Sequence, residues 1–445
     1  MAGTHSGVGK TTVATGLMAA FRRRGRRVGA AKVGPDYIDP GYHALATGRP
    51  SHTLDAWMCG EEVIAPLAAG AGAGCDLLVV EGVMGLFDGA GAGAFASSAH
   101  VARLLHAPVI LVVDASAMSG SVAAIVHGFA TFDPTLDVAG VVLNQVAGDN
   151  HEALLRGALA DGGIPVVGAL RRDPALQWRD RHLGLVPVVE SLPELTASVE
   201  RLAVAIEAGC DVDLLHRIAA GAAPLTTEPI PTRAPVTARR PRIALAGGAA
   251  FSFNYPENIT LLEQAGAELV PFDPLHDAAL PDRVDGLIAG GGFPEVYAPH
   301  LAANQTLLRD VRRRVNDGLV TWAECGGLLW LASSLDGHPM AGAIPCRATM
   351  TDRLTLGYRA ATTTRACPLG PAGLVFRGHE FHYSQTDPAG AALRLEGRMG
   401  VSHGGHSGPT LLASYVHVHL AGMPELAEAF VSACADGAGP PSPGA

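Results

Sequence analysis

Short aliphatic runs recur through the first half of the chain, separated by longer stretches in which apolar residues follow a helical period. The runs occupy residues 28–33, 76–82, 108–115, 138–146 and 164–170. Their content of Val, Ile and Leu is typical of strands that are buried on both faces. Because a longer stretch follows each run, the pattern predicts βαβ units and a parallel sheet, closed by an amphipathic helix over 192–209.

A second set of apolar runs follows a proline-rich stretch at 220–241, which lacks a hydrophobic period and predicts an interdomain linker. The later strands are predicted at 242–248, 267–272, 284–292, 319–325, 374–384 and 411–420. We therefore expect an α/β chain with two doubly wound, mostly parallel-sheet domains, over 1–219 and 242–435. Residues 436–445 are rich in Gly and Pro and are expected to form a disordered tail.

Composition allows large cores and excludes some partners. The 445-residue chain is 48% hydrophobic and 17% charged, with a formal net charge of -10. That charge argues against nucleic acid or an anionic membrane as the main partner, and we interpret the basic stretch 21–27 as the solvated end of a helix. The cysteines form no CxxC pair and no apolar run reaches the length of a membrane span. We therefore expect a cytoplasmic protein without a disulfide framework.

The chain opens with MAGTHSGVGKTT, a glycine-rich stretch that runs into Lys and Thr. A glycine-rich loop that opens a helix directs backbone N–H groups at a phosphate. In this interpretation Gly7 and Gly9 shape the loop, Lys10 reaches the β- and γ-phosphates, and Thr11 and Thr12 complete the site. The expected cofactors are ATP and Mg²⁺, with Thr11 as a metal ligand.

Two features of this opening are unusual. Five residues separate Gly3 from Gly9, one more than in the common phosphate loop. Two residues precede Gly3, too few for the buried strand from which such a loop normally hangs. We expect that the recorded start lies downstream of the true one or that the first strand is truncated, with poor stability or ATP affinity for the chain as given.

Carboxylates follow two of the predicted strands. Glu81 stands where a buried run meets a glycine-containing turn, and a charge there is costly unless it faces a metal or a cation. Glu81 is therefore predicted to hold Mg²⁺ with Thr11. Asp36 and Asp39 follow another strand, at the sheet edge where open parallel sheets bind ligands. The alternatives are a surface position for Glu81 and simple turn formation for the two aspartates.

The stretch TWAECGGLLWLA places Cys325 between a predicted strand and two glycines that open a helix. Such a turn exposes a thiol at a helix N-terminus, where the helix dipole favours the thiolate. A nucleophilic thiol needs a base, and ASYVHVHL supplies His417 and His419 on one face of the late strand. The turn in LIAGGGFPEVY offers the N–H groups of Gly292 and Phe293 to a developing oxyanion.

Both motifs resemble those of known families. GTHSGVGKT resembles the phosphate loop of dethiobiotin synthetase-like ATPases, and VVEG resembles their Mg²⁺-binding strand end. His5 stands where MinD/ParA partitioning ATPases carry a signature lysine, so a partitioning protein is not expected. The ECGG elbow, with GGGFPE and a Y-x-H strand, resembles the class I (triad) glutamine amidotransferase domain in its cobyrinic and cobyric acid synthase branch.

The amidotransferase resemblance also implies residue roles. By that resemblance His417 is the base, His419 is the less favoured candidate, and Glu380 of GHEFHYS belongs to the glutamine site. Val418 and His419 follow His417 where ordinary triad members have Pro-Glu, so the usual orienting glutamate is missing. The thiol and the imidazole then form a dyad, or they take a carboxylate from elsewhere.

Over residues 2–430 the chain resembles the cobyrinic acid a,c-diamide synthase family, on PDYIDPGYH, LDAWM, EGVMGLFDG and GHEFHYS. The resemblance implies a ligase of cobalamin biosynthesis that uses ATP and glutamine. It would amidate the a and c carboxylates of cobyrinic or hydrogenobyrinic acid through a carboxyl phosphate. The implied partners are glutamine and a corrin polycarboxylate, with Asp36, Asp39 and Asp88 on the substrate or metal side. A homodimer is left open.

Three alternatives remain at this point. The chain could amidate other corrin carboxylates, as cobyric acid synthase does, or act on Ni-sirohydrochlorin. It could also be a non-catalytic regulator that uses ATP as a switch, which would not need Cys325 on an elbow.

Overall fold

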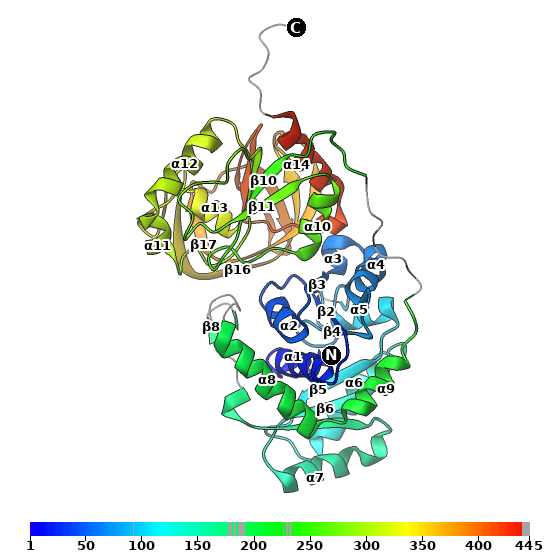
Figure 1. Cartoon of the computed structure of the whole chain (residues 1–445). Helices are drawn as coiled ribbons and strands as arrows, with labels where there is room; N and C mark the ends of the chain where they lie inside the picture. Colours follow the sequence, from blue (N-terminus) through cyan, green and yellow to red (C-terminus); the bar gives the residue numbers. More distant parts are fainter. Residues whose placement is uncertain are drawn as a thin grey trace. The chain divides into compact units, whose positions relative to one another are not determined.

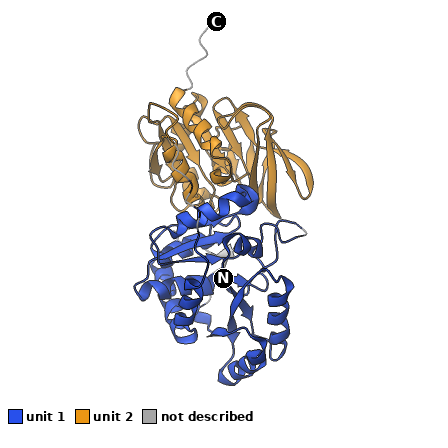
Figure 2. Cartoon of the chain, turned by 90° about the vertical axis from the view of Figure 1, so that its right-hand side faces the viewer, with its two compact units in different colours: residues 1–231 blue, residues 232–445 orange. Residues whose placement is uncertain are grey.

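In the computed structural model of the chain, the described residues are 1–91, 93–176, 180–181, 184–185, 192–225, 227, 230 and 234–437. The chain divides into two compact units, residues 1–231 and 232–445, coloured blue and orange in Figure 2. The division falls within the predicted linker 220–241. The tail was predicted from 436, but Asp436 is the last residue of a helix; the predicted tail lies outside the described residues from 438 onward.

The first unit contains parallel strands connected by helices (Figure 1). The parallel strands are β1 (Ala2–Gly3), β2 (Val28–Val33), β3 (Ser51–Leu54), β4 (Leu77–Glu81), β5 (Val109–Asp114), β6 (Val138–Val146) and β7 (Val166–Arg171). They form a sheet of order β1-β5-β6-β7 and a sheet of order β3-β2-β4, and every pair in both is parallel. The strands predicted from the apolar runs are confirmed, within two residues at each end.

The interpretation that two residues are too few for a strand before the phosphate loop is wrong. Ala2 and Gly3 form β1 and pair in parallel with β5. The main chain of Met1 bonds to the other neighbour, β4 and the residue that follows it. Its amino group donates to the Val80 carbonyl at 2.7 Å, and its carbonyl accepts from Gly82 N–H at 2.8 Å. Met1 thus connects the edge of β4 to the sheet of β5, which is why so short a strand holds its place. The expected loss of stability and ATP affinity stays a prediction.

Helices cover the strands of this unit. They are α1 (Lys10–Arg23), α2 (Asp39–Thr47), α3 (Ala56–Cys59), α4 (Glu61–Gly72), α5 (Ser98–Leu105), α6 (Ser121–Phe132), α7 (Asp149–Leu159), α8 (Leu192–Gly209) and α9 (Val212–Ala220). α1 and α8 lie side by side in Figure 1, and their buried apolar faces share one core with β2 and β5. The basic stretch ends α1, where exposed Arg23 pairs with Glu200 and Glu207 of α8.

The second unit contains a mostly parallel sheet of order β11-β10-β12-β13-β21-β20. Its strands are β10 (Arg242–Ala246), β11 (Glu268–Phe272), β12 (Gly286–Ala289), β13 (Val320–Glu324), β20 (His406–Gly408) and β21 (Leu411–Ser414). The helices of this unit are α10 (Pro256–Gln264), α11 (Ala298–Ala303), α12 (Gln305–Asn316), α13 (Gly326–Leu331) and α14 (Glu425–Asp436). β20 is the antiparallel edge strand, and the other pairs are parallel.

A second, largely antiparallel sheet in this unit was mostly missed from the sequence. It has the order β15-β14-β16-β18-β19, with β17 also paired to β16. Its strands are β14 (Ser334–Leu335), β15 (His338–Pro339), β16 (Arg347–Thr363), β17 (Val375–Asp387), β18 (Leu393–Gly397) and β19 (Gly400–Gly404). β16 carries many half-buried and exposed polar side chains, so it lacks the continuous apolar run that marks a buried strand.

The prediction that His417 and His419 lie on a late strand is also wrong. β21 ends at Ser414, and the chain then leaves the sheet. His417 instead forms a single bridge with His379 of β17, with N–H to carbonyl distances of 2.9 and 3.0 Å. The apolar residues that alternate with the histidines, Val416, Val418 and Leu420, suggested a strand because all three are buried.

In the described part of the chain, none of the helices has the length and apolar character needed to cross a membrane. All seven cysteines are free thiols.

Candidate functional site

The glycine-rich opening folds as a loop that leads from β1 into α1. Gly7 and Gly9 have φ angles of 84° and 93°, a conformation that residues with a Cβ rarely adopt. A Cβ at Gly9 would lie 2.2 Å from Nδ2 of Asn144, and this amide donates to the Val8 carbonyl at 2.8 Å. No described side chain caps α1, so its first N–H groups remain available to an anion.

Lys10 is the first residue of α1 and is buried against the loop. Its ammonium donates to the His5 carbonyl at 3.2 Å. Burial and the nearby charge of Lys32 lower the pKa of Lys10 to about 8. A phosphate group would replace the neutral carbonyl as a partner and strengthen the charged form.

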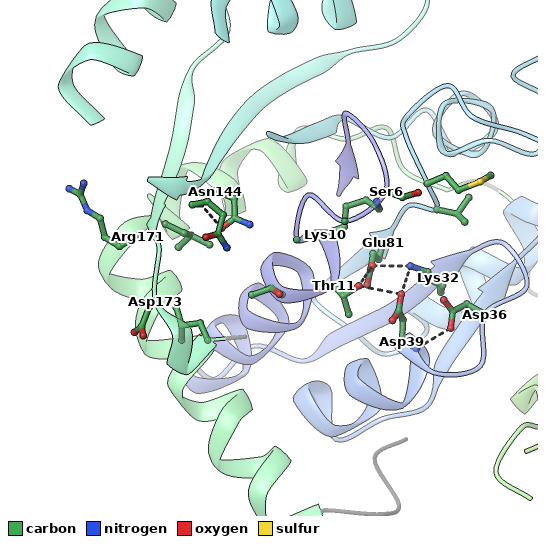
Figure 3. A pocket seen from close by; sticks show the side chains of 18 residues that line it. Ser6, Lys10, Thr11, Lys32, Asp36, Asp39, Glu81, Asn144, Arg171 and Asp173 are labelled. Carbon is green, nitrogen blue, oxygen red and sulfur yellow. Dashed lines mark hydrogen bonds and ion pairs between the residues drawn. The ribbon is translucent and has the colours of Figure 1, made fainter. Parts of the chain in front are cut away.

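A cavity of about 450 Å³ opens beside this loop (Figure 3). It brings together most of the predicted residues of this half: Gly7, Gly9, Lys10, Thr11, Thr12, Asp36, Asp39 and Glu81. In Figure 3 the labelled side chains of Asn144, Arg171 and Asp173 lie on one side of Lys10, and those of Asp36, Asp39 and Glu81 lie on the other. The cavity therefore has one end suited to a cation and phosphates, and another end where amide and apolar groups lie beside Arg171 and Asp173.

The carboxylate end is organised around a buried lysine that was not predicted. Lys32 of β2 donates to Asp39 Oδ2 at 2.6 Å and to Glu81 Oε1 at 2.8 Å. Burial lowers the pKa of Lys32, but the two carboxylates outweigh burial and raise it, so the lysine stays charged. The same lysine holds the pKa of Glu81 below its usual value against the effect of burial. A lone Lys inside an apolar run was the signal for this residue in the sequence.

The residues present fit a magnesium ion. Thr11 Oγ1 lies 2.7 Å from Glu81 Oε1 and 3.2 Å from Asp39 Oδ2, so a hydroxyl and two carboxylates face one point of the cavity. Burial and the charge of Asp36 raise the pKa of Asp39. Mg²⁺ prefers one or two protein carboxylates, with waters and substrate phosphates as further ligands. Thr11, Glu81 and Asp39 would hold it.

Glu81 is also fixed from behind. His43 Nε2 lies 2.5 Å from Glu81 Oε2, and His43 Nδ1 lies 3.1 Å from the Ser51 hydroxyl. His43 and Glu81 are fully buried, and Ser51 nearly so. These hydrogen bonds orient Oε2 of Glu81 and leave its Oε1 for Thr11 and Lys32.

Two predicted aspartates have structural partners. Asp36 Oδ1 accepts from the N–H groups of Ile38 and Asp39, at 2.8 and 3.1 Å, and so supports the turn that leads into α2. Asp88 accepts from Gly85 N–H at 2.9 Å and does not line the cavity, although its charge raises the pKa of Lys10.

In the second unit, Cys325 lies at the turn between β13 and α13. Its φ of 48° and ψ of −99° are unusual for a residue with a side chain. Cys325 N–H donates to the Ser414 carbonyl at 2.7 Å, which holds the turn in place. The turn also needs a glycine at position 327, because a Cβ there would lie 2.0 Å from the Ala289 carbonyl oxygen. The predicted strand–cysteine–helix elbow is present, but the expectation that it exposes the thiol is wrong, because Cys325 is buried.

His417 is the imidazole at this elbow. Burial lowers its pKa, but the charge and hydrogen bond of Cys325, together with Glu324, outweigh burial and raise the pKa to about 10. The ring also lies against the glycine turn, because a Cβ at Gly291 would lie 2.5 Å from His417 Cε1. His419 faces another carboxylate, with Nε2 3.6 Å from Glu257 Oε2.

Gly292 and Phe293 follow β12 directly beside the elbow. A Cβ on Gly326 would lie 3.0 Å from Gly292 N, so this main-chain nitrogen faces the residue after the cysteine. Phe293 is fully buried and packs edge-on against Phe253, with ring centroids 5.1 Å apart, which anchors the turn.

Glu380 of β17 forms a buried ion pair. Its Oε2 accepts from Arg359 Nε of β16 at 2.7 Å, and burial still raises the pKa of Glu380. Burial raises the pKa of Tyr415 as well, with added contributions from the charges of Cys325 and Glu380. Tyr415 therefore lies within electrostatic range of both, and its ring stacks on His382 at 3.7 Å. Arg359 was not predicted, because the strand that carries it was not.

A phosphate loop in one unit and a cysteine–histidine elbow in the other define the class of a two-domain, glutamine-dependent amidotransferase. Two family models match these parts of the chain. Residues 1–186 match the CobQ/CobB/MinD/ParA nucleotide binding domain, and residues 242–424 match the CobB/CobQ-like glutamine amidotransferase domain.

Curated relatives match nearly the whole chain. It is 47% identical to a hydrogenobyrinate a,c-diamide synthase of Streptomyces coelicolor, over 98% of this chain and 96% of the relative. It is also 47% identical to a protein of that name in Thermobifida fusca, over 96% of this chain and 94% of the relative. A cobyrinate a,c-diamide synthase of Synechococcus is 42% identical, over 98% of this chain and 97% of the relative. The chain belongs to the hydrogenobyrinate/cobyrinate a,c-diamide synthase family.

Proposed function

We propose that the chain amidates the a and c carboxylates of a corrin in cobalamin biosynthesis, with ammonia released from glutamine and with ATP to activate each carboxylate. The observation that carries this proposal is that both halves of the reaction have a built site in one chain. Relatives named for hydrogenobyrinate are 47% identical and a relative named for cobyrinate is 42% identical, so hydrogenobyrinic acid is the first substrate to test.

In the amidotransferase unit, the Cys325 sulfur attacks the side-chain amide carbon of glutamine. The C–N bond breaks, and His417 delivers the proton with which ammonia leaves. Water then hydrolyses the γ-glutamyl thioester and releases glutamate and the thiol. The N–H groups of Gly292 and Phe293 stabilise the oxyanion, and Glu380 with Arg359 borders the glutamine site. The hydrogen bond between Cys325 and His417 supports this assignment over His419.

In the nucleotide unit, a corrin carboxylate oxygen attacks the γ-phosphorus of ATP, and ADP leaves. Ammonia then adds to the acyl phosphate, and inorganic phosphate departs as the amide forms. Gly7, Gly9, Lys10 and Thr12 hold the phosphates, and Lys32 supplies a second positive charge beside them. Mg²⁺, held by Thr11, Glu81 and Asp39, would neutralise charge on the phosphate oxygens. Asp36 and Asp88 are proposed to act on the corrin side.

The test is incubation of the purified chain with glutamine, ATP and magnesium chloride. The reactions contain hydrogenobyrinic acid, cobyrinic acid or Ni-sirohydrochlorin, and mass spectrometry counts the amides formed. We expect a diamide from hydrogenobyrinic acid. A monoamide, further amidation of a diamide, or turnover of Ni-sirohydrochlorin alone would contradict the assignment and favour a related amide-forming ligase. Absence of glutamine hydrolysis would favour a regulator.

A further inference from the structure

The structure supplies a carboxylate behind His417, from a place that the sequence of the histidine segment does not indicate. Glu324 is the last residue of β13 and directly precedes Cys325. Its Oε2 lies 3.6 Å from His417 Nδ1, and its Oε1 accepts from Val418 N–H at 3.2 Å. One carboxylate therefore contacts both the ring and the main chain of the histidine segment.

The main chain fixes the two partners independently. Glu324 lies in the register between β13 and β21, opposite Ser414. His417 is held by the two main-chain hydrogen bonds to His379, and its ring stacks on the His379 ring with centroids 5.0 Å apart. The main chain therefore places the Glu324 carboxylate opposite the His417 imidazole, and neither side chain is a mobile surface group.

Burial makes this pair electrostatically significant. The side chains of Glu324 and His417 are 10% and 2% exposed. Burial raises the pKa of Glu324, while the interaction with His417 opposes that rise. A buried carboxylate next to an imidazole stabilises the protonated ring, which is the form that must donate a proton to the leaving ammonia.

We propose that Glu324 is the third member of a Cys325–His417–Glu324 triad, holding His417 Nδ1–H and stabilising the imidazolium during glutamine hydrolysis. This inference rests on the proposed glutaminase function. Glu324 acts through His417 and is therefore a positioning residue. It replaces the glutamate two residues after the histidine, a position that His419 occupies in this chain.

A second buried pair in the same unit provides a matched control. Glu257 of α10 faces His419 at the same 3.6 Å, and both side chains are buried. E257Q removes a buried carboxylate from beside a histidine, as E324Q does, but the histidine is His419 and not His417, whose pKa is raised by Cys325 and Glu324. The other titratable groups near His417 are Cys325, His379, Glu380 and His382, and they are unchanged in both variants.

The experiment compares wild type, E324Q, E324D and E257Q for glutamine hydrolysis over pH 5 to 10. We expect E324Q to lower kcat for glutamine by about 10²-fold or more, with KM changed less than about threefold. Loss of the negative charge should also move the upper limb of the kcat/KM profile to lower pH. E324D should recover part of kcat. E257Q should retain the wild-type profile.

Two further readouts separate the possible failures. Synthesis with ammonium chloride in place of glutamine should be the same in E324Q and wild type, because the nucleotide unit is intact. The rate of alkylation of Cys325 by iodoacetamide, followed by peptide mass spectrometry, reports the thiol–imidazole pair even if the chain hydrolyses no glutamine. Its pH dependence should shift in E324Q. Wild-type kcat and pH profile in E324Q, or equal loss of the ammonium-dependent reaction, would overturn the inference. An unchanged alkylation profile would do so too.

Discussion

Replacement of Lys32 by methionine should destabilise the first unit far more than the same replacement of Lys10, although both lysines border one cavity. Lys32 donates to Asp39, Glu81 and the Gly82 carbonyl at 2.6, 2.8 and 3.2 Å, and its side chain is 4% exposed. Lys10 donates to one neutral carbonyl at 3.2 Å.

The magnitudes follow from what each lysine leaves behind. Removal of one partner from a buried ion pair costs about 3–5 kcal/mol. Glu81 keeps the His43 and Thr11 contacts in K32M, so we expect the lower end, about 3 kcal/mol. Loss of a single hydrogen bond in K10M should cost about 1 kcal/mol. Magnesium chloride should recover stability in K32M more than in wild type, because the ion replaces the missing positive charge.

Hydrogen–deuterium exchange in increasing urea measures this, since it reports the two units separately. The peptides to follow are those of β2 and β4, with peptides of β10 and β12 as an internal control. If K32M protects β2 and β4 as well as wild type does, the buried lysine does not neutralise the carboxylates and the account of this site is wrong. Equal losses in K32M and K10M would also contradict it.

Three other predictions follow from the second unit. C325A should lose at least 10³-fold of glutamine-dependent synthesis yet keep synthesis with ammonium chloride; retention of glutamine use would remove the nucleophile assignment. G327A should displace the elbow, because its Cβ would lie 2.0 Å from the Ala289 oxygen, and should lower glutaminase kcat about tenfold or more while ammonium-dependent synthesis is kept. Burial lowers the pKa of His382 to about 4, so the folded state disfavours its protonation. Stability from this group is complete above the unfolded pKa near 6.5 and falls by about 3 kcal/mol as pH drops to about 4. Urea titrations at pH 7 and pH 4.5 should show that H382Q loses less unfolding free energy between the two pH values than wild type does. An equal loss in both proteins would exclude His382 as a source of this pH dependence.

The alternation of aliphatic runs and helical stretches predicted most of the parallel strands in both units, because strands covered on both faces need continuous apolar sequence. The antiparallel sheet of the second unit was not predicted, because most residues of its strand β16 are exposed or half-buried. Arg353 is exposed and Arg359 is half-buried, so the strand has no continuous apolar run. β1 was judged too short, but pairing is a property of neighbouring strands, and β4 and β5 supply it to Met1, Ala2 and Gly3.

The functional residues also fall into those that the sequence predicted and those that only the structure revealed. Glycine spacing and nucleophile position are local features, so the phosphate loop and the Cys325 elbow could be found in the sequence. Lys32, His43 and Glu324 act through contacts with residues far away along the chain, and only the fold brings those partners together. A charged residue inside or at the end of an apolar run was the visible signal for Lys32 and Glu324.

The most direct test of the central claim is the fate of the glutamine amide nitrogen. The purified chain is supplied with glutamine labelled with ¹⁵N at the side-chain amide, ATP, magnesium chloride, hydrogenobyrinic acid and unlabelled ammonium chloride at low concentration. The expected product is a diamide that carries ¹⁵N at both new amides and forms only when ATP is present. A diamide that carries only unlabelled nitrogen, or label transfer without ATP, would contradict it.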